Sequence, residues 1–301
     1  LEYGFLPNLR IPVVRQWNTA VEHAFGSHDT LWVGYVGSNS RDLIRREIGG
    51  PGSNDRVWLA LATNHGQSTY HALQAQYRHT LATGLQALAS YAWAHSIDNG
   101  SADGGLYWVS DALPSNVDRA SSDFDVRHSF SAALSYSGWK GWTLDAMFRA
   151  RSGFPINVLA SEQYLGIPFA NAFRPDLVGG QPVWVGGQLN SGAFAPTASG
   201  LQGTLGRNAI TGFGMNQLDL ALRREFAWRD AKSFELRVEA FNALNHPNFA
   251  DPVRFLDSPL FGQSPSMLNY MLGSGSPGSG LTPLFQSGGA RSLQLSLRFR
   301  F

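Results

Sequence analysis

The last ten residues, SLQLSLRFRF (292–301), alternate strictly between polar and apolar side chains. A period of two is typical of a β-strand with one apolar face, because successive side chains on a strand point to opposite sides of the sheet. We therefore expect a strand here whose polar side carries Arg298 and Arg300. Its apolar residues are Leu293, Leu295, Leu297, Phe299 and Phe301.

The same period recurs upstream in WTLDAMFRAR (142–151), MNQLDLALRREF (215–226) and SFELRVEA (233–240). Weaker alternation marks five more segments, so the sequence predicts nine strands and an all-β fold. The five segments are 14–25, 30–38, 69–79, 83–96 and 127–136. The charged residues on the polar sides of the three clear segments include Asp145, Arg149, Arg151, Asp219, Arg223, Glu235, Arg237 and Glu239.

The connections between these strands alternate between tight and long. Unstructured connections beyond ~15 residues are unusual in a compact soluble domain. A transmembrane β-barrel has this asymmetry, with short periplasmic turns and longer extracellular loops. The tight connections are 26–29, 80–82, 137–141 and 227–232, and the long ones are 39–68, 97–126, 153–214 and 246–290.

Alternation alone also fits a soluble β-sandwich, in which the charged face meets water and the apolar face meets the core. Aromatic residues favour the membrane barrel, because they gather at both ends of the strands, where interfacial girdles form. The one charge on an apolar track, Arg224, lies near a short turn. The aromatic residues beside the short turns are Phe25, Tyr77, Tyr136, Trp142, Phe226, Trp228 and Phe301; those towards the long loops are Trp17, Tyr35, Tyr70, Trp93 and Phe154.

Composition argues against several other classes of protein. Lys and Arg total 23 against 22 for Asp and Glu, and no polybasic run is present, so nucleic acid is not an expected partner. The absence of cysteine removes disulfides, thiolate zinc sites and cysteine nucleophiles. No stretch approaches the ~18 consecutive apolar residues of a membrane-spanning helix.

Strand direction gives a further expectation. If the short turns are periplasmic, the last strand descends to the periplasm, and counting back through nine strands places residues 1–13 outside the cell. A complete bacterial barrel has an even number of strands. We therefore expect residues 1–301 to be the C-terminal portion of a larger barrel, without its signal peptide or plug.

Seven segments that span nearly the whole chain in order carry a family signal. They are LWVGYVGSNSRDL (31–43), YAWAHSID (91–98), DFDVRHSF (123–130), SGFPINV (152–158), GRNAITGFGMNQLDLALRREF (206–226), FELRVEAFNALNHPNFADP (234–252) and SLQLSLRFRF (292–301). Together they resemble the C-terminal half of the barrel of TonB-dependent outer-membrane receptors, specifically the Oar-like group. The resemblance implies a roughly 22-stranded plugged barrel in the outer membrane of a Gram-negative bacterium, with outer-membrane lipid, the missing plug domain and the TonB system as partners.

The terminal aromatic resembles the signal that the barrel assembly machinery reads, which assigns that role to Phe301 with support from Phe299. A girdle aromatic that ends a strand is the simpler interpretation, and the two are compatible.

The charged ladder on the polar side of the strands has two interpretations. Pairing between strands would brace the wall and contact the plug, which we favour, and lining of a solute path is the alternative. Aromatic loop residues could stack on a sugar-like ligand or pack the loops themselves. These loop residues are Tyr107, Trp108, Tyr164 and Trp184.

Catalytic and metal sites are not expected. His128 and Ser129 are adjacent on a strand and point to opposite faces, so they do not form a base and nucleophile pair, and there is no G-x-S-x-G motif. Asp125, Arg127 and His128 are expected instead to brace the loop that enters the strand. Asp98, Asn99 and Asp103 could ligate calcium, but their spacing misses the EF-hand pattern. Glycines 203, 206, 212 and 214 suggest a solvated loop rather than a phosphate cradle.

The sequence thus predicts a non-enzymatic outer-membrane receptor without a cofactor, which takes up a bulky solute such as an oligosaccharide, peptide or metal chelate. The rival is a surface binding or adhesion barrel that displays long loops.

Overall fold

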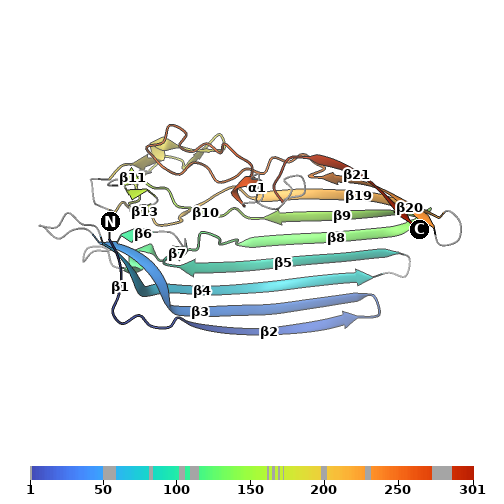
Figure 1. Ribbon diagram of the computed structural model, residues 1–301, viewed down its shortest axis with the longest axis horizontal. Coiled ribbons are helices and arrows are strands. Elements are labelled where there is room, and N and C mark those ends of the chain that lie inside the picture. The colour runs from blue at the N-terminus through green and yellow to red at the C-terminus, as the bar shows by residue number, and fades with distance from the viewer. Residues whose placement is uncertain are drawn as a thin grey trace, which may run out of the picture.

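Nine long antiparallel strands, joined in sequence order, form one sheet in the computed structural model (Figure 1). The structure describes residues 2–49, 59–80, 84–101, 106–108, 115–160, 163–164, 167–168, 170–171, 173–197, 202–227, 232–272 and 287–301. The nine strands are β2 (Val13–Phe25), β3 (Asp29–Gly49), β4 (Leu59–Thr80), β5 (Leu85–Asp98), β8 (His128–Trp139), β9 (Trp142–Arg151), β19 (Met215–Ala227), β20 (Ser233–Phe241) and β21 (Ser292–Arg300).

The sheet is open, because β2 pairs only with β3 and β21 pairs only with β20 among the described residues. The long connections gather at one end of the strands and the short ones at the other (Figure 1). The long-loop end also holds β1 (Glu2–Phe5), which runs parallel to the start of β4. None of the helices in the described parts of the chain, which include α1 (Leu268–Met271), has the length and hydrophobicity to cross a membrane.

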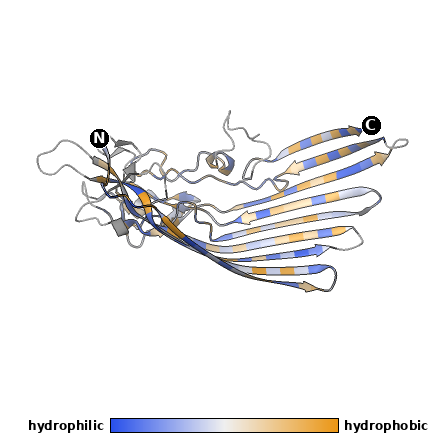
Figure 2. Cartoon of the chain, turned by 60° about the horizontal axis from the view of Figure 1, so that its bottom comes forward, coloured by the Kyte–Doolittle hydropathy of each residue, from blue (hydrophilic) through white to orange (hydrophobic). Residues whose placement is uncertain are grey.

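Strand register sorts the side chains onto two faces. Leu222 of β19 lies opposite Leu144 of β9 and Val238 of β20, and Val238 lies opposite Leu295 of β21. Directly opposed residues share a face, so these side chains form one continuous apolar face. The charged residues alternate with them on the polar face, and the alternation is visible as bands along the strands (Figure 2).

The apolar face has no second layer over it. Leu293 and Leu295 expose 76% and 70% of their surface, and Leu297 and Phe299 each expose 55%. In a β-sandwich, such side chains would be buried between two sheets. The apolar face is therefore an outer face, and the soluble sandwich is excluded.

Aromatic residues lie at both ends of the apolar face, with Trp17, Tyr35 and Trp93 towards the long loops, but the expectation is wrong for Tyr70, which the register places on the polar face opposite Ser38 and Ser96. Trp228 lies outside the described residues. Near the short turns, the rings of Phe226 and Phe234 stack with their centroids 4.6 Å apart, and Phe299 lies 6.3 Å from Phe234. The guanidinium of Arg224 lies 5.4 Å from the ring centroid of Trp142 and 4.8 Å from that of Phe226. This outward arginine thus lies against two aromatic rings of the girdle.

The turn between β8 and β9 shows why the short connections are tight. Lys140 and Gly141 have positive φ angles of 46° and 81° and join Trp139 to Trp142. Positive φ at both central residues is the type I′ geometry, whose twist matches that of the flanking strands.

The expectation of a loop over 39–68 is wrong, because β3 continues to Gly49 and β4 begins at Leu59. A strand of 21 residues is about twice the length that crosses a bilayer, so this hairpin projects beyond it. The register shifts twice between Ser40 and Arg45, and Asp42 has a φ of 56°. This irregularity interrupts the alternation and hides the strand from a period-two search.

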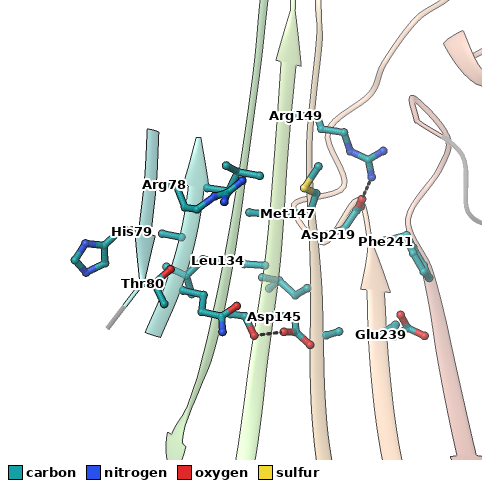
Figure 3. A pocket seen from close by; sticks show the side chains of 18 of the residues that line it. Arg78, His79, Thr80, Leu134, Asp145, Met147, Arg149, Asp219, Glu239 and Phe241 are labelled. Carbon is teal, nitrogen blue, oxygen red and sulfur yellow. Dashed lines mark hydrogen bonds and ion pairs between the residues drawn. The ribbon is translucent and has the colours of Figure 1, made fainter. Parts of the chain in front are cut away.

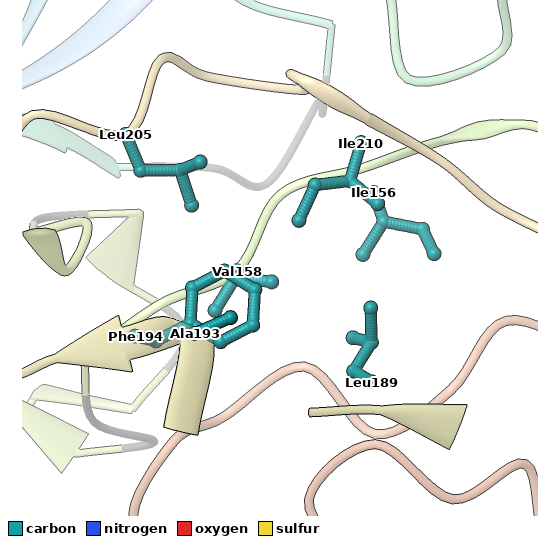
Figure 4. Close-up of a cluster of buried hydrophobic side chains, with 7 residues drawn as sticks. All are labelled: Ile156, Val158, Leu189, Ala193, Phe194, Leu205 and Ile210. Atoms are coloured by element: carbon teal, nitrogen blue, oxygen red, sulfur yellow. The ribbon is translucent and has the colours of Figure 1, made fainter. Parts of the chain in front are cut away.

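The expectation of an unstructured connection over 153–214 is also wrong. Its described residues form two-residue strands and a core of buried apolar side chains (Figure 4). Glycine- and proline-rich composition masked this small folded unit, which we call the loop core. It consists of Ile156, Val158, Leu189, Ala193, Phe194, Leu205 and Ile210.

Adjacent residues of β21 provide a matched test of the two faces. We expect Leu295→Arg to lower the free energy of unfolding in lipid vesicles by about 2 to 4 kcal/mol, the cost of a cation near the bilayer midplane. Gln294→Arg places the same charge on the polar face, opposite Glu239, and should change it by less than about 1 kcal/mol. Equal losses in denaturant titrations would contradict the assignment of the faces.

Candidate functional site

The charged residues of the polar face pair with one another. Arg149 forms an ion pair with Asp219, and Arg223 lies 3.3 Å from Asp145, so both pairs join β9 to its neighbour β19. Two further pairs have another geometry: Arg237–Glu239 at 2.7 Å lies along β20, and Arg300–Glu225 at 3.0 Å reaches from β21 past β20 to β19. Of the ten ladder residues predicted from the sequence, these contacts bring together seven, with Glu225 as an addition.

The three remaining ladder residues lie apart from these pairs. Arg298 and Glu235 are opposite each other in the register of β20 and β21. Arg151 ends β9 and turns towards the loops: its guanidinium lies 3.9 Å from the ring centroid of Phe154. Arg151 therefore lies at the long-loop end of the sheet and is not part of the paired ladder.

A short segment of the last long connection lies against the upper part of the ladder. Ser287 accepts a hydrogen bond from Arg149 at 2.8 Å, and the backbone N–H of Gly288 donates to the buried side chain of Gln217 at 2.7 Å. Gln217 in turn donates to Asp219 at 2.8 Å. These contacts brace the upper part of the ladder from a loop segment, in addition to the pairs between strands.

Below this segment the polar face is hollowed (Figure 3). The hollow has a volume of about 550 Å³ and spans β4 to β20. Asp145 and Glu239 contribute carboxylates, while Arg78 and Arg237 contribute guanidinium groups. Because both signs are present, the hollow suits polar or zwitterionic chemistry better than a single type of ion.

The long loops meet in a buried network of charges that we call the loop head. At its centre, Asp118 in the 3-10 turn Ser115–Asp118 accepts a hydrogen bond from Arg45 of β3 at 2.6 Å. The other carboxylate oxygen accepts from Arg174 at 2.8 Å. All three side chains are at most 3% exposed. One carboxylate thus ties a strand to two separate loops.

A third arginine closes the loop head. Arg207 donates to the backbone oxygens of Asp98 and Asp118 at 3.1 and 3.0 Å and lies 2.8 Å from the Asp98 carboxylate. It also contacts Asp123 at 3.1 Å. Buried charges of this kind are stable when paired and fully hydrogen-bonded, so the loops are fixed relative to β3 and β5.

Two of the three residues considered for calcium binding, Asp98 and Asn99, take part in this network. The Asp98 carboxylate also accepts from Ser101 at 2.5 Å, and Asn99 accepts from the backbone N–H of Gln67 at 2.8 Å. Their oxygens are engaged by arginine and by hydrogen-bond donors rather than grouped around a cation. Asp103 lies outside the described residues, and no cluster of metal-ligating side chains occurs among those described.

The catalytic alternative also finds no support in the geometry. His128 bonds through Nδ1 to the hydroxyl of Tyr91 at 2.7 Å, on the apolar face, whereas Ser129 follows it on the polar face. Asp125 is buried, accepts from the backbone N–H of Ser96 at 2.7 Å and lies 3.2 Å from Arg127. Asp125 and Arg127 thus brace the loop as expected, while His128 contacts a strand residue instead.

The four aromatic loop residues that were considered for ligand stacking differ in how far the structure describes them. Trp184 packs against the loop core and lies 5.2 Å from the ring of Phe213, so it packs the loop itself. Tyr107 and Trp108 lie in the short strand β6 (Leu106–Trp108), and Tyr164 in β11 (Gln163–Tyr164), but their side chains are outside the described residues.

Comparison with known proteins agrees with this geometry. The model of a family described as an outer membrane beta barrel domain matches residues 2–269. The chain belongs to this outer membrane beta-barrel family. Like other members, it is a protein of the outer membrane, and its sheet is part of a barrel wall.

One of the similar solved structures shows the same fold. The outer membrane transporter YddB from Escherichia coli matches with a TM-score of 0.55 and 9% identity, over 98% of this chain and 33% of that one. The FrpB iron transporter from Neisseria meningitidis has a TM-score of 0.49 and 12% identity, over 99% of this chain and 33% of that one. This barrel chain therefore spans about a third of the length of these proteins. A comparison with curated proteins found no match.

Sequence reasoning missed the loop head of the barrel. Arg45, Asp118 and Arg174 stand in segments without a period, and their pairing depends on contacts between loops. Arg207 lies in GRNAI (206–210), and its partners Asp98 and Asp123 lie in YAWAHSID (91–98) and DFDVRHSF (123–130). All three segments resemble the receptor family, and this was the signal that could have indicated them.

The central carboxylate of the loop head provides one test. Asp118→Asn should leave Arg45 and Arg174 buried without full charge compensation and lower stability by about 3 to 5 kcal/mol. Trypsin should then cleave the loops of the folded barrel at lower temperature. The matched change Glu225→Gln removes a carboxylate that is 49% exposed and should cost less than about 1 kcal/mol. Similar effects of both variants would contradict the role of Asp118.

A second test concerns Asp251, in the long connection after β20. Burial raises the pKa of this carboxyl to about 6, although Arg151 and Arg254 act against the shift. The folded state thus favours protonated Asp251. Its contribution to the free energy of unfolding is therefore fully present below the pKa that Asp251 has in the unfolded chain, and it is lost as pH rises through about 6. Hydrogen exchange in residues 246–266 should accelerate between pH 5 and pH 7.5 beyond the intrinsic chemical rate. Asp251→Asn should abolish that extra acceleration, and an unchanged profile would contradict the prediction.

Proposed function

We propose that this chain forms the C-terminal part of the barrel of an outer-membrane receptor that imports a bulky solute through a plugged lumen. The observation that carries the proposal is the paired charge ladder with its hollow of about 550 Å³ on the face opposite the lipid-facing side chains. A lumen wall must be polar and hydrated, whereas a purely structural barrel of few strands fills its interior with side chains.

The open sheet bears on the size of the lumen. Barrels of about eight strands have interiors just wide enough for side chains, whereas 22-stranded transporters need a plug. Among the described residues, the nine long strands leave both edges of the sheet unpaired. We therefore propose that the complete barrel has more strands and a wide interior, with a plug domain and energisation through the TonB system, in line with the Oar-like resemblance.

The ladder has a dual role in this proposal. Its upper part, braced by Ser287 and Gly288, stiffens the wall, while Arg78 and Glu239 in the hollow meet the plug or the passing solute. An oligosaccharide, a peptide or a metal chelate matches the mixed charge of the hollow. Phe299 and Phe301, which expose 55% and 94% of their surface at the end of β21, remain our candidates for the assembly signal.

The rival function is a surface binding barrel that displays its loops without transport. The buried contacts of the loop head and the loop core favour this function, because a rigid external surface suits adhesion. The two functions differ in whether bound solute crosses the membrane.

Uptake by cells that express the complete protein separates the two functions. The candidate solutes are a radiolabelled ferric chelate, a peptide and an oligosaccharide, tested in turn. We expect the cells to accumulate one of them and a protonophore to abolish that accumulation. Cells without the gene provide the control. Glu239→Arg, which breaks the pairing in the hollow, should reduce that uptake with unchanged protein in the membrane. Binding that a protonophore does not affect, with no accumulation, would support the rival.

A further inference from the structure

Arginine and histidine side chains form a band on the apolar side of the sheet, just beyond the aromatic residues at the long-loop end. Register places Trp17, Gly37, His71 and His95 side by side across β2 to β5. The next row outward begins with Arg15, opposite Asn39, which is opposite Thr69. The side chains therefore change along the strands from aliphatic to aromatic, then histidine, then arginine.

Further cations reach this band from the neighbouring loops. Arg119 donates to the hydroxyl of Thr69 at 3.4 Å, and Arg127 lies 2.7 Å from Nε2 of His95. Arg41 lies opposite Val13 at the next row outward. We call the arginines of this surface, Arg15, Arg41, Arg119 and Arg127, the cationic band; they lie beside the row of His71 and His95.

Acidic groups compensate part of this charge. Asp42 lies 3.9 Å from both Arg10 and Arg41, and the buried Asp125 pairs with Arg127. Arg15 and Arg119 form no ion pair with the described residues and are exposed. Two guanidinium groups are thus available to an external anion.

The position of the band identifies its occupant. Arg15 lies four residues beyond Thr19, whose partner Tyr35 marks the aromatic girdle, or ~13 Å along the strand. The polar headgroup layer occupies roughly 5 to 8 Å on each side of the hydrocarbon. Since the strands of a barrel are tilted, Arg15 and Arg119 lie at the headgroup layer or at its outer edge.

We propose that the cationic band binds phosphate-bearing headgroups of the lipids that surround the barrel on its extracellular side. Arginine binds phosphate through paired, charge-assisted hydrogen bonds, and basic residues near an anionic lipid surface each strengthen binding. The band is continuous with the face that contacts hydrocarbon, so a lipid whose chains lie on that face brings its headgroup to these arginines.

The test uses the complete protein purified in detergent, with bound lipid counted by native mass spectrometry. The probes are diphosphorylated lipid A and the same lipid with its phosphates removed. The wild-type protein should retain more of the phosphorylated lipid than of the dephosphorylated lipid. Arg15→Gln with Arg119→Gln should weaken this retention roughly twenty-five-fold, at about fivefold for each arginine, and leave the weak retention of the dephosphorylated lipid unchanged.

Arg298→Gln makes the same chemical change on the polar face of β21 and should retain phosphorylated lipid as the wild type does. The thermal unfolding temperature of all variants should be unchanged, because none of these arginines pairs with an acid among the described residues. Equal retention of both lipids by the wild type would overturn the proposal. So would unchanged retention by the double variant, which would leave an acidic protein partner as the occupant of the band.

Discussion

A lipid bilayer gives a protein backbone no partner for its hydrogen bonds, and most of this structure follows from that constraint. Each spanning strand must pair along its whole length on both sides, which produces long neighbouring strands joined by hairpins. One face of every strand must then be apolar, because it contacts hydrocarbon. The other face is free to be charged, so Asp145, Arg223 and Arg237 can occupy positions that would be costly in a closed core.

The same constraint explains which parts of the fold could be predicted from the sequence. Lipid acts on alternate residues of β21, β20, β19 and β9, so the period of two is clear in their sequences. All nine strands were found, although β3 and β4 extend well beyond their predicted ends. Outside the membrane the constraint ends. In β3 a bulge near Asp42 shifts the register, and Arg45 and Glu47 are buried by loops instead of facing water, so hydropathy there carries no strand signal.

The loop head was beyond prediction for a different reason. Asp118 meets Arg45 across 73 residues of sequence and Arg174 across 56 residues. No local pattern encodes such pairings, since each residue alone resembles an ordinary solvated loop charge. Polar-face pairs such as Arg223–Asp145 were more accessible to reasoning, because both residues stand on strands whose faces and order were already known.

The contrast between these two groups of charges bears on how the loops work. Pairs on the polar face are partly exposed, so water screens them and each contributes little to stability. Asp118 and its arginines are almost fully buried, where loss of one partner is far more costly. A binding surface built from loops usually loses affinity to the entropy of ordering them. In the described parts of the loops this cost is already met: buried ion pairs fix Asp118, Arg174 and Arg207 to β3 and β5, and the loop core packs residues between 156 and 210. Under the proposed function, a solute that binds to the described part of the loop head would therefore meet a preformed surface, whose shape Asp118, Arg174 and Arg207 hold in place.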